Sequence, residues 1–218
     1  NVRNEEGIII AEFEHGKGNS ITIETLRKLR EVVKTADEDY SVKGIILTGA
    51  GRTFSSGFDL KMFLGFKDVK EVAGFLQEED EILTELFMCK KPVVAAINGH
   101  AVAGGLIFSM AADYRIAKNH PKISLGMSEI KIGLPLSLAQ AGVMRFGFDS
   151  DRKYRDVMYF GKMFNVEQAR DFGIIDELVE DAELIPQAKK IVTKWIDNPG
   201  RAFTKLKEGL KKPVADMI

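Results

Sequence analysis

Short apolar runs that alternate with amphipathic segments constrain the fold of this chain more than any other feature. The first three runs are IIIAEF at 8–13, GIIL at 44–47 and VVAAI at 93–97. Runs of this length and composition are typical of buried strands. Between the first two, apolar residues repeat at helical spacing with charges on the opposite face: Ile23, Leu26, Leu29 and Val33. Residues 67–89 repeat the same pattern, so the sequence predicts an α/β core.

The second half of the chain has a different pattern. YRIA at 114–117 and KISL at 122–125 predict two further short strands, and Asp113 is expected to fix the turn before the first of them. From about Leu138 onwards the pattern predicts helix throughout, except for a short IIDEL at 174–178. A helix from Val166 is expected to be capped by Asn165 and to end at Gly173.

Composition limits the classes of function. A chain of 218 residues fits one domain. Its net charge is -1 with both signs interspersed, so the sequence shows no basic patch of the kind that binds nucleic acid or an anionic membrane. One cysteine, Cys89, and three scattered histidines predict no metal site. No apolar stretch approaches the roughly 20 residues that span a bilayer. We expect a cytoplasmic protein. Because the sequence does not begin with Met, removal of an organelle-targeting segment is an alternative.

Three segments have the composition of functional loops. They are GAGRTFSSGFDLKMF at 49–63, NGHAVAGGLIFSM at 98–110 and SLGMSEIKIGLPLS at 124–137. Gly104 and Gly105 stand in the first turn of a predicted helix, where each costs about 0.5–1 kcal/mol relative to alanine and therefore needs a reason. Asp59 is expected to cap a short helix from Leu60. None of the segments matches a dinucleotide loop, a P-loop or a hydrolase nucleophile elbow.

In this order and spacing, the three segments resemble the crotonase family of enoyl-CoA hydratases and isomerases. Asn19 in GKGNSI and FNVEQARDFGIIDELV at 164–179 extend the resemblance. It implies a ββα spiral core over residues 1–137 and a helical trimerisation region over 138–218, which together form one continuous unit. It also implies a homotrimer or hexamer. The predicted helices after Leu138 fit such assembly through many apolar residues: Val143, Met144, Phe146, Met158 and Phe164.

The resemblance also implies a substrate and a binding site. The substrate would be an acyl-CoA thioester, so CoA is part of the substrate and no separate cofactor is expected. The backbone N–H groups of Phe58 and Gly104 would form the oxyanion hole for the thioester oxygen. Ser56, Lys61 and Lys17 would contact the CoA portion. Two plainer alternatives are that the glycine pair only permits close packing and that Lys61 is a solvated helix residue.

The acidic residues distinguish the reactions of the family. Its hydratases use two glutamates; one matches Glu129, and Ile107 occupies the position of the other. An aliphatic side chain cannot activate water, and the resemblance is therefore greatest to the single-glutamate Δ3,Δ2-enoyl-CoA isomerases. Glu129 among apolar neighbours such as Leu125 and Met127 is expected to have a raised pKa. The alternatives are a hydratase, another single-base reaction such as decarboxylation or thioester hydrolysis, a non-catalytic acyl-CoA-binding protein, and a Glu129 that is an ordinary surface residue.

Overall fold

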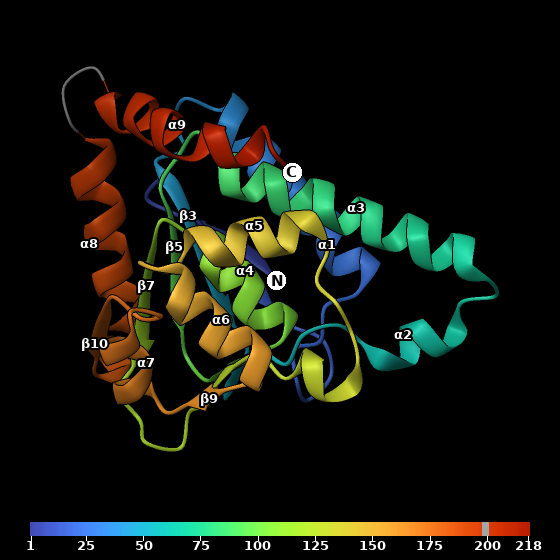
Figure 1. Ribbon diagram of the computed structural model, residues 1–218. Helices are drawn as coiled ribbons and strands as arrows, with labels where there is room; N and C mark the ends of the chain where they lie inside the picture. Colours follow the sequence, from blue (N-terminus) through green and yellow to red (C-terminus); the bar gives the residue numbers. More distant parts are fainter. Residues whose placement is uncertain (198–200) are drawn as a thin grey trace.

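Two sheets organise the chain (Figure 1). The computed structural model describes residues 1–197 and 201–218. The larger sheet has the strand order β1 (Val2–Glu5), β2 (Ile8–Phe13), β3 (Gly44–Gly49), β5 (Val93–Ile97), β7 (Tyr114–Lys118) and β10 (Glu177–Val179). The smaller sheet has the order β4 (Thr53–Ser55), β6 (His100–Val102), β8 (Leu125–Gly126) and β9 (Met163–Phe164). Neighbouring strands are parallel except for the pairs β1–β2 and β8–β9.

Helices make the remaining regular structure. The first five are α1 (Ile23–Glu38), α2 (Leu60–Gly65), α3 (Val69–Met88), α4 (Gly104–Ala111) and the 3-10 turn η1 (Glu129–Ile132). After them come α5 (Leu138–Phe146), α6 (Asp151–Phe160), α7 (Val166–Phe172), the 3-10 turn η2 (Asp181–Glu183), α8 (Leu184–Ile196) and α9 (Ala202–Ala215). In the described ranges, none of these helices combines the length and hydropathy that crossing a bilayer requires.

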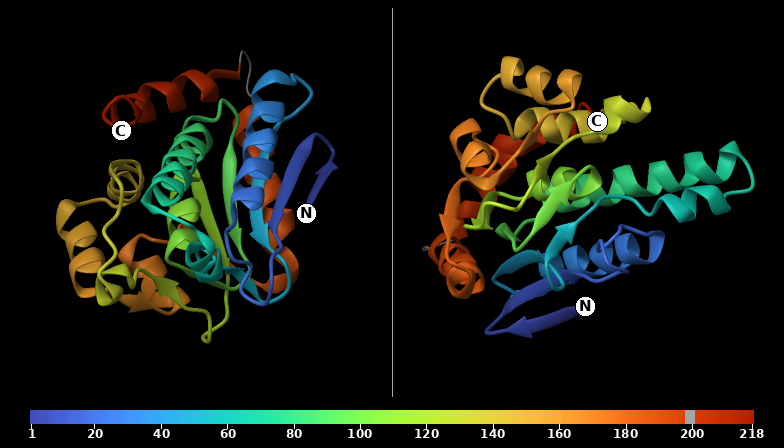
Figure 2. Two further views of the ribbon diagram at one scale, coloured as in Figure 1. Left: turned by 90° about the vertical axis from the view of Figure 1, so that its right-hand side faces the viewer. Right: turned by 90° about the horizontal axis from the view of Figure 1, so that it is seen from below.

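The larger sheet is covered on both faces. Ile8 and Ile10 of β2 pack with Val192 of α8, whereas Ile9 and Ala11 of the same strand belong to the larger core cluster on the opposite face. This alternation follows from the two-residue repeat of a strand. Figure 1 shows α8 on one side of the sheet and α1 and α3 on the other. In Figure 2 the β1–β2 hairpin lies at one edge of the molecule and α6 lies on the far side.

The main sequence predictions are confirmed. The strands at 8–13, 44–47, 93–97 and 114–117 are β2, β3, β5 and β7, and the intervening amphipathic segments form α1 and α3. Helix α7 begins at Val166 with an Asn165 capping box and ends at Gly173, which has φ 87°. Asp113 accepts a hydrogen bond from the Val93 N–H at 2.8 Å, so it does fix the turn before β7.

Two strand predictions need correction. Of KISL only Leu125 is in a strand, because the Ile123 N–H donates to the His120 carbonyl and the Ser124 N–H donates to His100 Nδ1, which makes a turn. Of IIDEL only the end is in β10, because the Ile174 N–H is used to close the end of α7. The short strands β1, β4, β6 and β9 were not predicted. Strand β9 also breaks the all-helical pattern expected after Leu138.

The residues after 137 are joined to the core by strands and by buried charge. Strand β10 pairs with β7, and β9 pairs with β8. Lys207 and Lys211 of α9 each place Nζ 2.7 Å from a carboxylate oxygen of buried Asp113. Burial alone would raise the Asp113 pKa, but the two lysine charges outweigh it and hold the pKa below its usual range. Burial lowers the pKa of Lys211 to about 8.

A second buried acid, Glu79, forms no ion pair with any residue that the structure describes. Glu79 of α3 is fully buried, and its Oε2 accepts a hydrogen bond from Gln140 Nε2 at 2.8 Å. Its other oxygen, Oε1, has no partner among the residues that the structure describes. Burial raises the pKa of Glu79 to about 8, so the folded protein holds this carboxyl group protonated at neutral pH.

Glu79→Gln should therefore change how stability depends on pH. The unfolded chain ionises Glu79 near the ordinary glutamate pKa of 4.5, whereas the folded chain does so at about 8. Rising pH between these values favours unfolding of the wild type by up to about 1.4 kcal/mol per pH unit. The variant lacks this loss, so its stability relative to wild type should increase from pH 5 to pH 8. Urea titrations of both proteins at several pH values measure the difference, and a constant difference would contradict the assignment.

Candidate active site

Three parallel strands of the smaller sheet lead to the three predicted site segments. Strand β4 pairs with β6, and β6 pairs with β8. Phe58 follows the end of β4 by three residues, Gly104 follows the end of β6 by two, and Glu129 follows the end of β8 by three. The carboxyl ends of parallel strands lie at one edge of a sheet, where α/β proteins commonly bind ligands. The topology therefore brings together the three segments that carry the predicted chemistry.

The loops after β4 and β6 touch each other. Gly57 has φ 88°, and a Cβ on it would lie 2.8 Å from Ala103 Cβ and 3.0 Å from Gly104 N. The Ile21 N–H donates to the Gly57 carbonyl at 2.8 Å, and the Asp59 N–H donates to the Ile21 carbonyl at 3.0 Å. Within residues 1–197 and 201–218, the N–H groups of Phe58 and Gly104 have no protein acceptor. Both donors are therefore left unused by the described part of the chain, although the residue Gly104 itself is buried.

Gly104 and Gly105 have different reasons to be glycine. A Cβ on Gly105 would lie 2.3 Å from the Ser55 carbonyl oxygen, so the backbone of β4 occupies that space. A Cβ on Gly104 would have only ordinary contacts, the nearest at 3.4 Å from Gly57 Cα. Close packing thus explains Gly105 but not Gly104. The N–H of Gly104 is one of the unpaired donors in the first turn of α4, where the helix dipole favours negative charge.

The residue before α4 is held in an unusual conformation. Ala103 has φ 54° and ψ -131°, a region that residues with a side chain rarely adopt. Its N–H donates to the Gly126 carbonyl at 3.0 Å, which ties the start of α4 to β8. Backbone strain of this kind persists where the surrounding structure over-determines it, and it concentrates at functional sites.

Glu129 is the first residue of η1 and is half-buried. One carboxylate oxygen, Oε2, accepts a hydrogen bond from the Ser128 N–H at 2.8 Å. Burial raises the pKa of Glu129 and outweighs the opposite effect of this and its own backbone N–H. A carboxylate with a raised pKa is suited to accept and return a proton near neutral pH.

Ile107 lies within α4 and is 1% exposed. It belongs to the large core cluster, together with Leu106 and Phe108. The position that the crotonase resemblance assigns to a second acid is therefore an apolar core position in this chain.

Of the residues predicted to contact CoA, Lys17 and Ser56 lie on two loops that meet, and Lys61 lies in the helix that follows. The Ser56 N–H donates to the Gly18 carbonyl at 2.8 Å, so Ser56 lies beside the loop that contains Lys17. Lys61 is in the first turn of α2, where its N–H donates to Asp59 Oδ1 at 2.8 Å. This confirms Asp59 as the cap of α2. Ser56, Lys17 and Lys61 are all exposed and open to a ligand.

Two further residues tie these loops together. Asn19 has φ 49° and is buried, and its side-chain amide donates to the carbonyls of Ala50 and Thr53 at 2.8 and 2.6 Å. His15 Nε2 lies 3.2 Å from Asp59 Oδ2. The resemblance had pointed to Asn19 but not to its bonds, and sequence analysis missed His15 altogether because its partner is 44 residues away.

Aromatic side chains surround the Phe58 end of the site. Phe58, Phe63 and Phe75 contact one another with ring centroids 5.3–6.0 Å apart, and Phe66 contacts both Phe63 and Phe75. Such edge contacts are favourable packing for aromatic rings. The cluster gives the candidate site an apolar wall. Sequence analysis did not single it out, although the FLGF motif at 63–66 contributes two of the rings.

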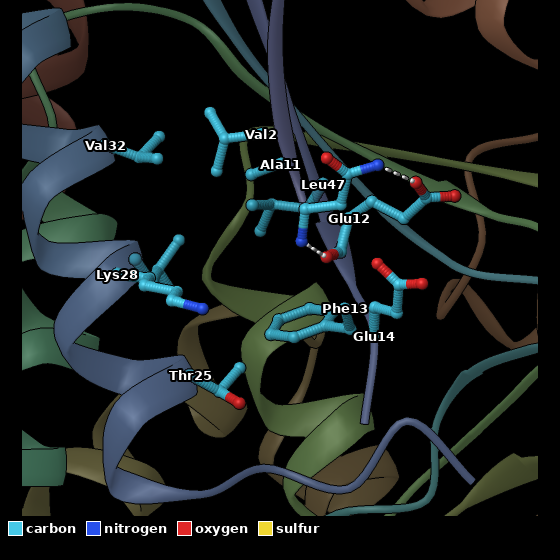
Figure 3. A pocket seen from close by; sticks show the side chains of 11 residues that line it. Val2, Ala11, Glu12, Phe13, Glu14, Thr25, Lys28, Val32 and Leu47 are labelled. Carbon is cyan, nitrogen blue, oxygen red and sulfur yellow. Dashed lines mark hydrogen bonds between the residues drawn. The ribbon is translucent and has the colours of Figure 1, made fainter. Parts of the chain in front are cut away.

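Three cavities of the structure lie away from the predicted site residues, and two of them, of about 300 Å³ each, lie beside Trp195. A cavity of about 50 Å³ lies between α1 and β2, lined by residues such as Phe13, Thr25 and Lys28, and none of the predicted site residues reaches it (Figure 3). In the described part of the chain, no three His, Cys, Asp or Glu side chains are grouped as a metal ion would require.

Comparison with known proteins gives the family. The family model described as enoyl-CoA hydratase/isomerase matches residues 3–217. This chain belongs to the enoyl-CoA hydratase/isomerase family. Its predicted crotonase-type fold is thereby confirmed, and the human mitochondrial delta3-delta2-enoyl-CoA isomerase structure superposes with a TM-score of 0.91. That match has 25% identity and covers 99% of this chain and 84% of the human one.

Relatives of this family member carry the names of different reactions. Enoyl-CoA delta isomerase 1, mitochondrial, of Mus musculus is 26% identical over 215 residues, which are 97% of this chain and 73% of the mouse protein. A probable enoyl-CoA hydratase of Mycobacterium leprae is 31% identical over 193 residues, 82% of this chain and 62% of its own length.

The two glycines of α4 should respond differently to alanine. Gly105→Ala forces a Cβ against the Ser55 carbonyl, and overpacking of this kind typically costs about 1–3 kcal/mol. At about 2–4 °C per kcal/mol, its Tm should fall by several degrees. Gly104→Ala should leave Tm unchanged or slightly higher, yet weaken acyl-CoA turnover by crowding the free N–H. Calorimetry and turnover of both variants test the contrast, which equal losses of Tm would overturn.

Proposed function

We propose that this family member shifts the double bond of a 3-enoyl-CoA to the 2 position, with Glu129 as the only base. The observation that carries the proposal is that Ile107 is a core residue at the position where, by the crotonase resemblance, a hydratase would have its second acid. The raised pKa of Glu129 supports its role as the base. The relatives named as enoyl-CoA delta isomerases in mouse and human support the same reaction class.

The chemistry follows from the arrangement of the groups. Glu129 removes a proton from C2 of the acyl chain, and the electrons delocalise over C2 to C4 and the thioester oxygen. The N–H groups of Phe58 and Gly104 donate to this oxygen as it becomes negative, which lowers the barrier by several kcal/mol. Protonated Glu129 then returns the proton to C4. The double bond now lies between C2 and C3, and the carboxylate is restored without water.

Efficient hydration is not expected from the same site. Addition of water across a double bond needs one group to deprotonate the water and another to protonate C2. Glu129 serves as one such group, and the Ile107 side chain supplies no second one. The hydratase name of the Mycobacterium leprae relative makes crotonyl-CoA hydration the reaction to compare directly.

Glu129→Gln tests the role of the base. The substitution keeps the shape of the side chain, so isomerisation of 3-enoyl-CoA should fall by about 10²–10⁴-fold, the usual contribution of a positioned acid–base group. Affinity for CoA should change little, because the predicted CoA contacts are on other loops. Spectrophotometric assays with 3-enoyl-CoA and crotonyl-CoA side by side provide the measurement, and melting curves show whether the variant is folded. The proposal would be wrong if the wild type hydrated crotonyl-CoA as fast as it isomerised 3-enoyl-CoA.

Acyl-CoA binding can be tested without turnover. A ligand that binds only the folded state raises Tm by mass action, so saturating acetyl-CoA should stabilise both wild type and Glu129→Gln. A shift in both proteins without isomerisation in either would favour the non-catalytic binding protein. No shift in wild type would rule out the acyl-CoA site itself.

We also propose that the chain assembles as a trimer or hexamer, but the reason differs from the one given by the sequence. Val143, Met144 and Phe164 are buried in the chain's own core. Exposed apolar side chains support assembly instead, namely Leu138, Tyr159, Phe160, Leu206, Leu210 and Met217. Large exposed apolar surface commonly marks an interface. Light scattering at micromolar concentration should give three or six times the chain mass of 24.3 kDa, and a monomer would contradict the proposal.

A further inference from the structure

The N-terminus of α5 is attached to two adjacent acidic residues of α3. Ser137 Oγ donates to Asp80 Oδ1 at 2.5 Å, and Gln140 Nε2 donates to Glu79 Oε2 at 2.8 Å. The same two α5 residues close a capping box. The Gln140 N–H donates to Ser137 Oγ at 3.0 Å, and the Ser137 N–H donates to Gln140 Oε1 at 3.1 Å. We call these four side chains the α3–α5 clamp.

The clamp lies immediately after the segment that carries Glu129. Only residues 133–136 separate η1 from the capping residue Ser137. The Leu134 N–H donates to the Glu129 carbonyl at 3.0 Å, and Gly133 turns the chain with φ 70°. At the other end, Glu129 follows β8, which is paired with β6. The Glu129 segment is therefore held from one side by the smaller sheet and from the other by α3.

The composition of the clamp indicates that it fixes a position. Glu79 is fully buried with one oxygen unpartnered in the described part of the chain, and a buried polar group of this kind is costly. A leucine or methionine on this face of α3 would avoid that cost. Hydrogen bonds require a defined distance and direction, whereas apolar packing alone tolerates sliding of one helix on another. The hydrogen bonds of the clamp therefore fix how far α5 can shift along α3.

We propose that Asp80 is a positioning residue, whose hydrogen bond to Ser137 sets the position of Glu129 relative to the N–H groups of Phe58 and Gly104. Glu79, in the middle of α3, and Gln140, in the first turn of α5, hold the same two helices together from within the core. This inference rests on the proposed function, because it assigns Glu129 the proton transfer. The competing explanation is that the clamp only stabilises α5, as any helix cap does.

Two substitutions at one residue separate these explanations. Asp80→Ala removes the acceptor, whereas Asp80→Asn keeps an oxygen that can accept from Ser137. A misplacement of about 1 Å can cost about 10²-fold in rate. We therefore expect kcat for 3-enoyl-CoA to fall by about 10- to 100-fold in Asp80→Ala, with KM little changed, and to be largely restored in Asp80→Asn.

Asn165→Ala is the matched control for lost stability. Asn165 and Gln168 form a capping box on α7, and neither side chain is hydrogen-bonded to α3 or to residues 129–137. This variant should lose a comparable amount of Tm and keep its kcat. Equal losses of kcat in Asn165→Ala and Asp80→Ala at the same folded fraction would overturn the positioning role.

Hydrogen exchange gives a readout that does not depend on turnover. Peptides covering residues 129–137 should exchange faster in Asp80→Ala than in wild type, in Asp80→Asn or in Asn165→Ala. Unchanged exchange in this segment would refute the clamp even if activity fell. If wild type fails to isomerise 3-enoyl-CoA, the proposed function is wrong, and faster exchange confined to 129–137 would still support the clamp.

Discussion

The site depends on the parallel pairing of three strands that are each only two or three residues long. Strands β4, β6 and β8 are too short to be stable alone, and the β4–β6 pairing is interrupted by a register shift between Thr53 and Ser55, so contacts made by the turns after the strands must help to hold them. Gly105 lets the backbone of β4 approach α4, and the Ala103 N–H binds the Gly126 carbonyl. A shift in this ladder would move the Phe58, Gly104 and Glu129 segments relative to one another.

Burial has different consequences for three acids of this chain, Asp113, Glu79 and Glu129. Asp113 has two lysines beside it, stays ionised and anchors α9. Glu79 has no cationic partner in residues 1–197 and 201–218 and is held protonated within the α3–α5 contact. Glu129 is only half-buried, and in the described ranges no Lys, Arg or His forms an ion pair with it. Its pKa is therefore set mainly by desolvation, which leaves its charge free to change during a reaction.

Local sequence patterns predicted those parts of the fold and site that depend on neighbouring residues. The strand runs at 8–13, 44–47, 93–97 and 114–117, the helix periodicity and the caps Asp59 and Asn165 are local, and the structure confirms them. The contact of His15 with Asp59 and that of Asp113 with Lys207 join residues 44 and 94 positions apart, and no local pattern reports them. Glu79 lies in the polar run QEEDE, which favours a solvated face; only the packing of α3 shows that it points inward with Phe75 and Ile82.

Not only the side chain of Ile107 but also its surroundings are apolar. A hydratase needs a second carboxylate and also the water that it holds. At Ile107 a carboxylate would replace a side chain that is 1% exposed in a continuous apolar cluster, and it would be desolvated without a cation to compensate. The burial of Ile107 in this cluster is therefore the structural ground for the single-base reaction that we propose.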